Sequence, residues 1–366
     1  MMIRMYDFKA QYNQIKDKID NSIQSVLNDS AFSSGKYVEK FENEFSNYIG
    51  SKYCVAVNNG TSALHASLLA LNIKYGDQVL VPTFSFFATC ESVSLTGATP
   101  IFVDSDYDNF NLDLKDLESK ITDNTKAIIC VHLYGQSCNM DRLKEICKKY
   151  NLYLIEDAAQ AHGAEYMNKK IGTFGDFSCF SFYPTKNLGA YGEGGAILTN
   201  NRENYKKLQS IRNHGSSKQY QHDMIGHNFR MSGFQGAILS VKLKYLDKWN
   251  NIRSRNAKLY NSYLSNVQYV QTPKIINGYK HVFHQYVIKV KNRDLLKDYL
   301  IQNKIESAIY YPIPCHLQSI YKNTLNTNSF SEKLANEVLA LPVAEHISKD
   351  NIKYISDTIC KFYLRK

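Results

Sequence analysis

One lysine, Lys186, lies among residue types that suit covalent chemistry with an aldehyde. It belongs to the stretch SFYPTKNLGAYGEGGAILTN, residues 181–200, between an apolar run at 177–183 and another at 195–199. Several glycines here let backbone segments approach closely. Lysine becomes nucleophilic near neutral pH when it is partly desolvated or beside another cation. A lone lysine after a strand is usually a solvated surface residue, so the interpretation depends on two stretches upstream.

The first upstream stretch is LIEDAAQAHGA, residues 154–164, in which Asp157 ends an apolar run. A carboxylate there is costly without a positive partner. The protonated nitrogen of pyridoxal phosphate is such a partner, and the plainer alternatives are a helix cap or an ion pair with a structural arginine. Glu156 should point to the opposite face and form a salt bridge. Gln160 is placed to bind the ring hydroxyl of the cofactor, and we interpret His162 as a loop histidine with satisfied hydrogen bonds.

The second upstream stretch is NNGTSALHASLLAL, residues 58–71, in which a strand runs into a predicted helix. Gly60, Thr61 and Ser62 lie where free amide groups and the helix dipole favour a phosphate. By itself this pattern indicates no more than a well-capped helix. Ser181, upstream of the lysine, is placed to reach the same phosphate. A phosphate loop, then an aspartate, then a lysine together predict a pyridoxal phosphate site and an aminotransferase.

The elements that would position these groups alternate along the chain. Short apolar runs at 53–57, 78–82, 99–104, 126–133 and 152–157 alternate with helical patterns at 62–71, 86–95, 113–120 and 140–150. Continuous apolar strands joined by helices predict an α/β fold with a mostly parallel, doubly covered sheet. Functional loops of such a sheet lie beyond the carboxyl ends of the strands, which is where the lysine, aspartate and phosphate loops fall.

The second half of the chain has a different texture. We predict a helix at 201–213, a polar loop at 214–229 and one long helix at 232–264, followed by a small α+β unit. The predicted boundary divides a large cofactor-binding domain, 1–245, from a smaller carboxyl-terminal domain, 246–366.

Composition narrows the class of protein. The chain has 366 residues and a net charge of +10, with lysines scattered over predicted helix surfaces. No nucleic-acid-binding motif accompanies this charge, so an anionic small molecule is favoured over nucleic acid. The eight cysteines form no C-x-x-C pair, and we expect neither disulfides nor a metal site. No signal peptide or membrane-spanning run is evident, which predicts a cytoplasmic protein without membrane contact.

A fourth stretch, GHNFRMSGFQGAILSVKL at 226–243, places Asn228 and Arg230 before an amphipathic helix. With this stretch the chain resembles the DegT/DnrJ/EryC1/StrS sugar-nucleotide aminotransferases along nearly its whole length. The resemblance includes GKYVEKFENEF, GDQVLVPTFSFFAT, EDAAQAHGA, SFYPTKNLGAYGEGGAILTN and IYYPIPCHLQ. It implies the type I fold of pyridoxal-phosphate-dependent transferases, with a seven-stranded, mostly parallel sheet.

The resemblance also implies roles for single residues. Lys186 would bond to the cofactor and shuttle protons, Asp157 would pair with the pyridine nitrogen, and Gln160 with the ring hydroxyl. The implied phosphate site comprises Gly60, Thr61, Ser62 and Ser181, together with Asn228 from a neighbouring subunit. Phe86 matches an aromatic residue that stacks on the cofactor ring. Since Asn228 would act across an interface, the implied unit is a homodimer with shared active sites.

The implied reaction moves an amino group from L-glutamate to a nucleotide-linked keto-hexose. The segments YDFKAQYNQIK, HNFRM and YYPIPCHLQ most resemble relatives that aminate carbon 3 of a dTDP- or UDP-linked 3-keto sugar used in surface glycans such as lipopolysaccharide. Expected substrate contacts are Tyr183, Lys218, Tyr311 and His316. Tyr310 replaces a histidine found in some relatives. Alternatives are amination at carbon 4, a sugar 3-dehydratase, against which Lys186 argues, and a non-catalytic, cofactor-binding regulator.

Overall fold

The computed structural model describes residues 2–321 and 329–364. Within these ranges the largest sheet has seven strands in the order β1-β9-β8-β5-β4-β2-β3. β9 alone runs in the direction opposite to the other six strands. Their bounds are β1 Tyr53–Val57, β2 Gln78–Pro82, β3 Thr99–Val103, β4 Thr125–Val131, β5 Tyr153–Asp157, β8 Phe177–Ser181 and β9 Gly195–Thr199. The predicted mostly parallel α/β sheet is therefore confirmed.

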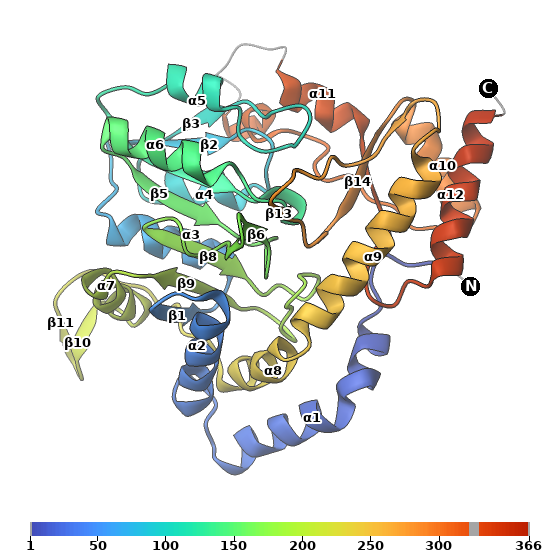
Figure 1. Cartoon of the computed structure of the whole chain (residues 1–366). Coiled ribbons are helices and arrows are strands. Elements are labelled where there is room, and N and C mark those ends of the chain that lie inside the picture. The colour runs from blue at the N-terminus through green and yellow to red at the C-terminus, as the bar shows by residue number, and fades with distance from the viewer. Residues whose placement is uncertain (1, 322–328, 365–366) are drawn as a thin grey trace.

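Helices cover both faces of this sheet (Figure 1). The first face carries α2 Lys36–Ile49, α5 Leu114–Ser119, α6 Met140–Tyr150 and α8 Gly233–Leu243. The second face carries α3 Gly60–Ala70, α4 Ala88–Ser94 and α7 Arg202–Arg212. Alternate strand residues enter the two cores, because successive side chains of a strand point to opposite faces. Leu154 of β5 packs on the first face and Ile155 on the second.

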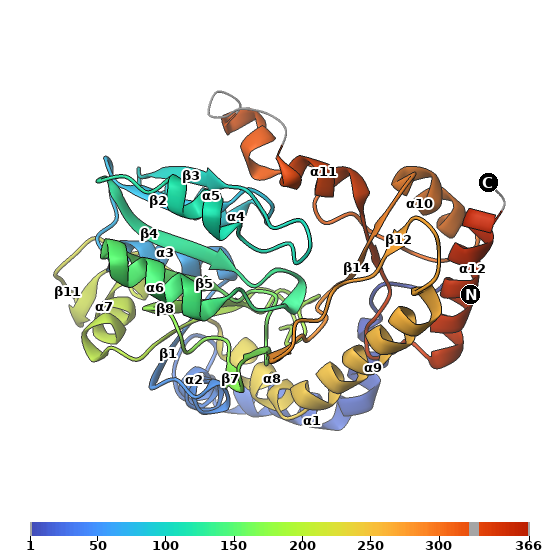
Figure 2. The ribbon, with the colours of Figure 1, turned by 45° about the horizontal axis from the view of Figure 1, so that its top comes forward.

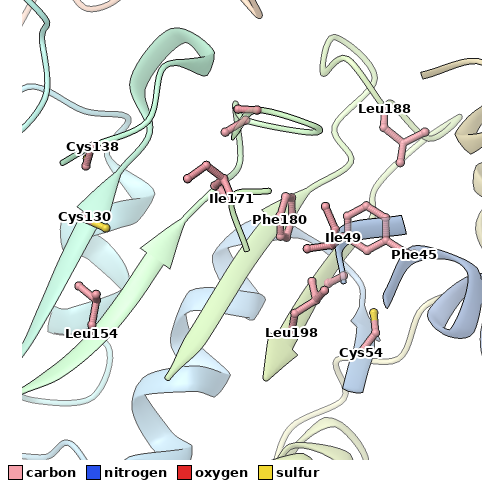
Figure 3. Packing of buried hydrophobic residues seen from close by; sticks show 14 of the residues in the cluster. Phe45, Ile49, Cys54, Cys130, Cys138, Leu154, Ile171, Phe180, Leu188 and Leu198 are labelled. Carbon is pink, nitrogen blue, oxygen red and sulfur yellow. The ribbon is translucent and has the colours of Figure 1, made fainter. Parts of the chain in front are cut away.

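The first face shows how aromatic residues join a helix to the sheet. Phe45 of α2 meets Phe180 of β8 edge to face, with ring centroids 5.0 Å apart. Ile49 and Leu198 lie beside them (Figure 3). Gly50 ends α2 in the left-handed region at φ 90°, where glycine avoids the steric cost of a Cβ.

The carboxyl-terminal part has its own core, built on a small antiparallel sheet of β12 Val270–Gln271, β14 Tyr286–Val290 and β15 Val338–Leu341. The helices here are α9 Leu246–Leu264, α10 Arg293–Gln302, α11 Phe330–Glu337 and α12 Lys349–Leu364. Figure 2 shows α9 running from the large sheet toward this part, with α1 Phe8–Asn28 nearby. Ile3 pairs with Ile305, so the amino terminus also lies here. The division at residue 245 stays a prediction.

Shorter elements complete the described chain. Three short strands, β6 Glu165–Tyr166, β7 Lys169–Lys170 and β13 Tyr279–Lys280, form a sheet that ties the two parts together. The short 3-10 helices are η1 Leu133–Gly135, η2 Cys315–Leu317 and η3 Ser319–Tyr321.

Three details differ from the sequence-based expectations. The predicted helix at 232–264 is two helices, α8 and α9, separated at Lys244 and Tyr245. The prediction joined them because the apolar spacing continues across the turn between them. The predicted polar loop at 214–229 contains a hairpin of β10 Ser216–Lys218 and β11 Gln221–His222. The elements α11 and β15 were not predicted. In the ranges 2–321 and 329–364, no helix has the length and apolar character needed to cross a membrane.

Candidate active site

A cavity of about 730 Å³ lies beyond the carboxyl ends of β5 and β8, beside the start of α3. Most of the predicted site residues line it. They are Gly60, Thr61, Phe86, Asp157, Gln160, Ser181, Tyr183, Lys186 and Tyr311. Segments far apart in sequence therefore converge on one space, as the parallel sheet requires.

Lys186 lies in the loop that follows β8. Its N–H donates to the carbonyl of Tyr183 at 2.8 Å, which closes a turn. A Cβ on Gly189 would lie 2.3 Å from the carbonyl oxygen of Pro184, so the return of the loop requires glycine. Burial lowers the pKa of Lys186 to about 8, although the Asp157 carboxylate opposes this effect. Roughly a tenth of the amine is thus unprotonated at pH 7, far more than for an ordinary lysine, and the unprotonated amine is the nucleophile.

Asp157 ends β5 and points to the α3 and α4 face of the sheet. Its Oδ2 accepts a hydrogen bond from the hydroxyl of Thr89 at 2.9 Å, and its Oδ1 accepts one from the N–H of Ala159 at 3.2 Å. Ser85 and Thr89 share a further hydrogen bond of 2.9 Å. Burial raises the pKa of Asp157, because these donors and Lys186 compensate the buried charge only in part. The carboxylate can therefore accept another positive partner from the cavity.

Glu156 points to the other face, as predicted. Its Oε2 lies 3.2 Å from Nε2 of His132, and its Oε1 accepts a hydrogen bond from the hydroxyl of Ser178 at 2.6 Å. Three backbone N–H groups within residues 172–175 also donate to it, at 2.8–3.0 Å. Burial opposes the charge of Glu156, but these donors outweigh burial and hold its pKa below the ordinary value.

The partner of Glu156 is a histidine rather than an obligate cation. Complete burial disfavours the charged form of His132. Nδ1 of His132 accepts a hydrogen bond from the N–H of Cys138 at 3.1 Å. A proton on Nδ1 would point at that N–H and would break this hydrogen bond. The geometry therefore assigns His132 the neutral form with the proton on Nε2, and the contact is a charge-assisted hydrogen bond.

The start of α3 lies against Ser181. A Cβ on Gly60 would be 2.6 Å from the Cβ of Ser181, so only glycine allows this approach. Asn59 caps the helix by accepting the N–H of Ser62 at 2.7 Å. Gly60, Thr61 and Ser181 line the cavity, whereas Ser62 is buried and is not among the lining residues. The helix start and the Ser181 hydroxyl together suit an anionic group such as a phosphate.

Gln160 is held by two hydrogen bonds within the protein. Its Oε1 accepts the N–H of Tyr134 at 2.7 Å, and its Nε2 donates to the hydroxyl of Tyr311 at 3.0 Å. Phe86 is partly exposed beside Tyr311, with ring centroids 6.0 Å apart. The proposed contacts of Gln160 and Phe86 with a cofactor ring stay predictions.

Three other predicted residues lie away from this cavity. Lys218 is exposed on β10, and Asn228 is exposed and bridges to Asn213. His316 is buried, with Nε2 3.1 Å from Glu332. A position outside this chain's own cavity is expected if Asn228 acts in the active site of a neighbouring subunit. That role of Asn228 stays a prediction.

His162 differs from the expectation. It is fully buried against Phe180 and Phe182. Among the described residues neither ring nitrogen has a hydrogen-bond partner of good geometry, so the histidine is not satisfied as predicted. Burial lowers its pKa to about 3, which keeps it neutral beside Lys186.

The residues that line the cavity but were not selected from the sequence include Tyr6, Glu193, His284 and Gln285. Nε2 of Gln285 donates to the hydroxyl of Tyr6 at 2.6 Å. His284 and Gln285 begin the apolar run HQYVIKV, which carries a strand pattern but no indication that its first residues reach the site. Only the packing of the carboxyl-terminal part against the large sheet brings them there.

Comparison with known proteins agrees with this geometry. Residues 13–360 match the sequence profile of the DegT/DnrJ/EryC1/StrS aminotransferase family. A pleiotropic regulatory protein of Geobacillus stearothermophilus is 41% identical, over 99% of each chain. A dTDP-3-amino-3,6-dideoxy-alpha-D-galactopyranose transaminase of Aneurinibacillus thermoaerophilus is 40% identical, also over 99% of each. The crystal structure of S. venezuelae DesV in complex with a ketimine intermediate superposes with a TM-score of 0.97 at 36% identity, covering 100% of this chain and 99% of that one.

Proposed function

Because the chain belongs to the DegT/DnrJ/EryC1/StrS aminotransferase family, we propose that it transfers an amino group from L-glutamate to carbon 3 of a nucleotide-linked 3-keto hexose. The sugar is linked to dTDP or UDP, and the product is an amino sugar for surface glycans. The observation that carries this proposal is the convergence of Lys186 and Asp157 on one cavity beside the start of α3. The nearly full-length similarity to a dTDP-3-amino sugar transaminase supports the choice of carbon 3.

Enzymes of this family use pyridoxal phosphate, and the residues present fit that cofactor. Lys186 offers an amine whose pKa is lowered to about 8. Asp157 is a buried carboxylate whose compensation within the protein is incomplete. The space that Gly60 leaves beside Ser181 suits the phosphate. When bound, the cofactor supplies an electron sink that stabilises a carbanion next to the amino group.

The chain's own residues then have distinct tasks. Nζ of Lys186 would hold the cofactor and, once released from it, would carry a proton between the cofactor carbon and the sugar carbon. Asp157, oriented by Thr89, favours the proton on the pyridine nitrogen. Thr61 and Ser181 hold the phosphate together with the N–H groups of α3. Tyr183 and Tyr311 line the side of the cavity that we assign to the sugar.

We further propose a homodimer with shared active sites. Asn228 and Lys218 are exposed on the segment after α7, where they can serve a neighbouring subunit's phosphate and the sugar's diphosphate, respectively. His316 is proposed as a substrate contact that would need its segment to move, since its side chain is buried in this conformation. A nucleotide-sugar substrate would place the enzyme in the cytoplasm.

Two alternatives remain for the experiment to decide. One is amination of a 4-keto sugar by the same residues. The other is a regulatory protein that binds cofactor without turnover, which the name of the Geobacillus stearothermophilus relative brings into consideration.

The test incubates the purified protein with L-glutamate and a panel of dTDP- and UDP-linked 3-keto and 4-keto sugars. Product mass and NMR spectra identify the aminated carbon. We expect amination of a 3-keto sugar by the natural protein and none by Lys186→Ala. Amination of only 4-keto sugars would move the reaction to carbon 4, and a protein that takes up pyridoxal phosphate but aminates nothing would favour the regulator.

A further inference from the structure

Resting on the proposed function, we propose that His284 is a substrate-binding residue whose unprotonated Nε2 accepts a hydrogen bond from a hydroxyl or amine group of the nucleotide-linked sugar. His284 immediately precedes β14 and lines the same cavity as Lys186 and Asp157. Three observations carry the inference: a relay of side-chain amides beside the ring, a closely held backbone, and a second ring nitrogen that has no partner among the described residues, on a residue that lines the cavity.

The relay sets which ring nitrogen carries the proton. Nδ2 of Asn250 donates to the carbonyl of His162 at 2.8 Å, so Oδ1 of Asn250 is an acceptor. That oxygen accepts Nδ2–H of Asn187 at 2.8 Å, and the same Nδ2 donates to the carbonyl of Val282 at 3.0 Å. Oδ1 of Asn187 must therefore be an acceptor as well, and Nδ1 of His284, 3.2 Å away, must donate to it.

The ring can carry no second proton at neutral pH. Burial holds the pKa of His284 well below its ordinary value, and the charges of Lys186 and Arg253 add to this effect. With the single proton on Nδ1, Nε2 presents a lone pair.

The backbone of His284 is held closely against η1, the short helix that follows β4. The N–H groups of Val282 and Gln285 donate to the carbonyls of Gly135 and Tyr134 at 3.0 and 3.3 Å. A Cβ on Gly135, at φ +100°, would lie 3.1 Å from the nitrogen of His284, so there is no room for a larger residue. The ring is therefore fixed before a ligand arrives, which reduces the entropy cost of binding.

Nε2 has no partner within the part of the chain that the structure describes. His284 is only 4% exposed. Binding is therefore weakened if a ligand displaces the water at Nε2 without donating a hydrogen bond to it. Sugar hydroxyls and amines offer such a donor, whereas a purely apolar ligand would not. The site thus favours a hydroxylated or aminated ligand at this position.

The test compares His284→Asn with the natural protein. Asparagine can keep a donor toward Asn187, because its amide nitrogen can take the place of Nδ1, but it has no atom at the position of Nε2. The matched control is His281→Asn, since His281 is also buried, with a pKa lowered by burial to about 3, but lies outside the lining of the cavity. Calorimetry measures the Kd of the amino-sugar nucleotide product for the pyridoxamine phosphate form, in which that product cannot react.

We expect His284→Asn to weaken binding about tenfold, the effect of one lost hydrogen bond, with His281→Asn unchanged. Side-chain nitrogen NMR of the natural protein should show His284 protonated on Nδ1 and an Nε2 signal that shifts when the product binds. An unchanged Kd in His284→Asn, an equal loss in His281→Asn, or a proton on Nε2 would overturn the inference. A natural protein that binds no nucleotide sugar would overturn the proposed function and this inference with it.

Discussion

Glu156 and Asp157 are consecutive carboxylates on β5, and both are buried, yet their surroundings differ. Glu156 receives hydrogen bonds from His132, Ser178 and three backbone N–H groups, and its pKa is lowered. Asp157 receives hydrogen bonds from Thr89 and Ala159, and its pKa is raised. Because successive side chains of a strand point to opposite faces of the sheet, Glu156 lies against the loop at 172–175 and Asp157 lies in the cavity.

The difference separates a structural charge from a functional one. Glu156 organises the loop at 172–175 and leaves nothing to offer a ligand. Burial raises the pKa of Asp157, so its ionisation costs the folded chain free energy that a bound cation can recover. Substitutions at the two positions should therefore have opposite effects on stability and activity.

The largest expected effect is on catalysis by Asp157→Asn. Loss of the carboxylate removes the group that favours a proton on the cofactor nitrogen, so kcat/KM should fall by about 10³-fold. Stability should be equal or higher, because a buried, partly compensated charge is removed. Steady-state kinetics and thermal unfolding measure the two quantities. Near-normal turnover would show that the two carboxylates do not differ in function.

Glu156→Gln should mainly affect stability. Removing the charge breaks a buried network and should lower the free energy of unfolding by about 3 kcal/mol. Urea unfolding measures the change, and the control is Glu145→Gln, since Glu145 pairs with Arg142 on the surface and should contribute less than about 1 kcal/mol. A Glu156→Gln protein as stable as the control would mean that the network contributes no net stability.

The pH dependence of the two variants should also be opposite. The lowered pKa of Glu156 gives stability that is present above its unfolded value and lost as pH falls through the folded value. The deficit of Glu156→Gln should therefore shrink on acidification. The raised pKa of Asp157 gives stability that is present below its unfolded value and lost as pH rises through the folded value. The advantage of Asp157→Asn should thus grow as pH rises. Urea unfolding from about pH 2 to pH 7, which extends below and above the unperturbed carboxyl pKa values near 4, would reveal parallel trends if the assignment were wrong.

The smallest expected effect concerns Thr89, which orients Asp157. Thr89→Val keeps the shape but removes the hydroxyl, and kcat/KM should fall about tenfold, the cost of one lost hydrogen bond. Thr89→Ser keeps the hydroxyl and should restore most of the activity. The absorbance of bound cofactor against pH provides a second measurement, since a less well-held Asp157 should alter it. Equal loss in both variants would indicate packing rather than hydrogen bonding.

Much of the fold could be predicted from local pattern. The apolar runs at 53–57 and 78–82 are strands with these same bounds, and the helix predicted at 140–150 is α6. Long, strongly periodic segments are reliable because their burial pattern is written in consecutive residues. The sequence did not predict the break between α8 and α9, because the residues there are Lys244 and Tyr245 and neither is a glycine or proline.

By itself, the sequence determined the alternating strands and helices and the order of phosphate loop, aspartate and lysine, because these depend on neighbours along the chain. It also indicated that Glu156 and Asp157 face opposite sides, since strand alternation is local. Only the tertiary structure decided that His132 contacts Glu156 and that Tyr6 and His284 reach the cavity. It also decided that the buried ring nitrogens of His162 find no hydrogen-bond partner among the described residues. These contacts join segments that are distant in sequence, and their burial and protonation depend on what packs around them in three dimensions.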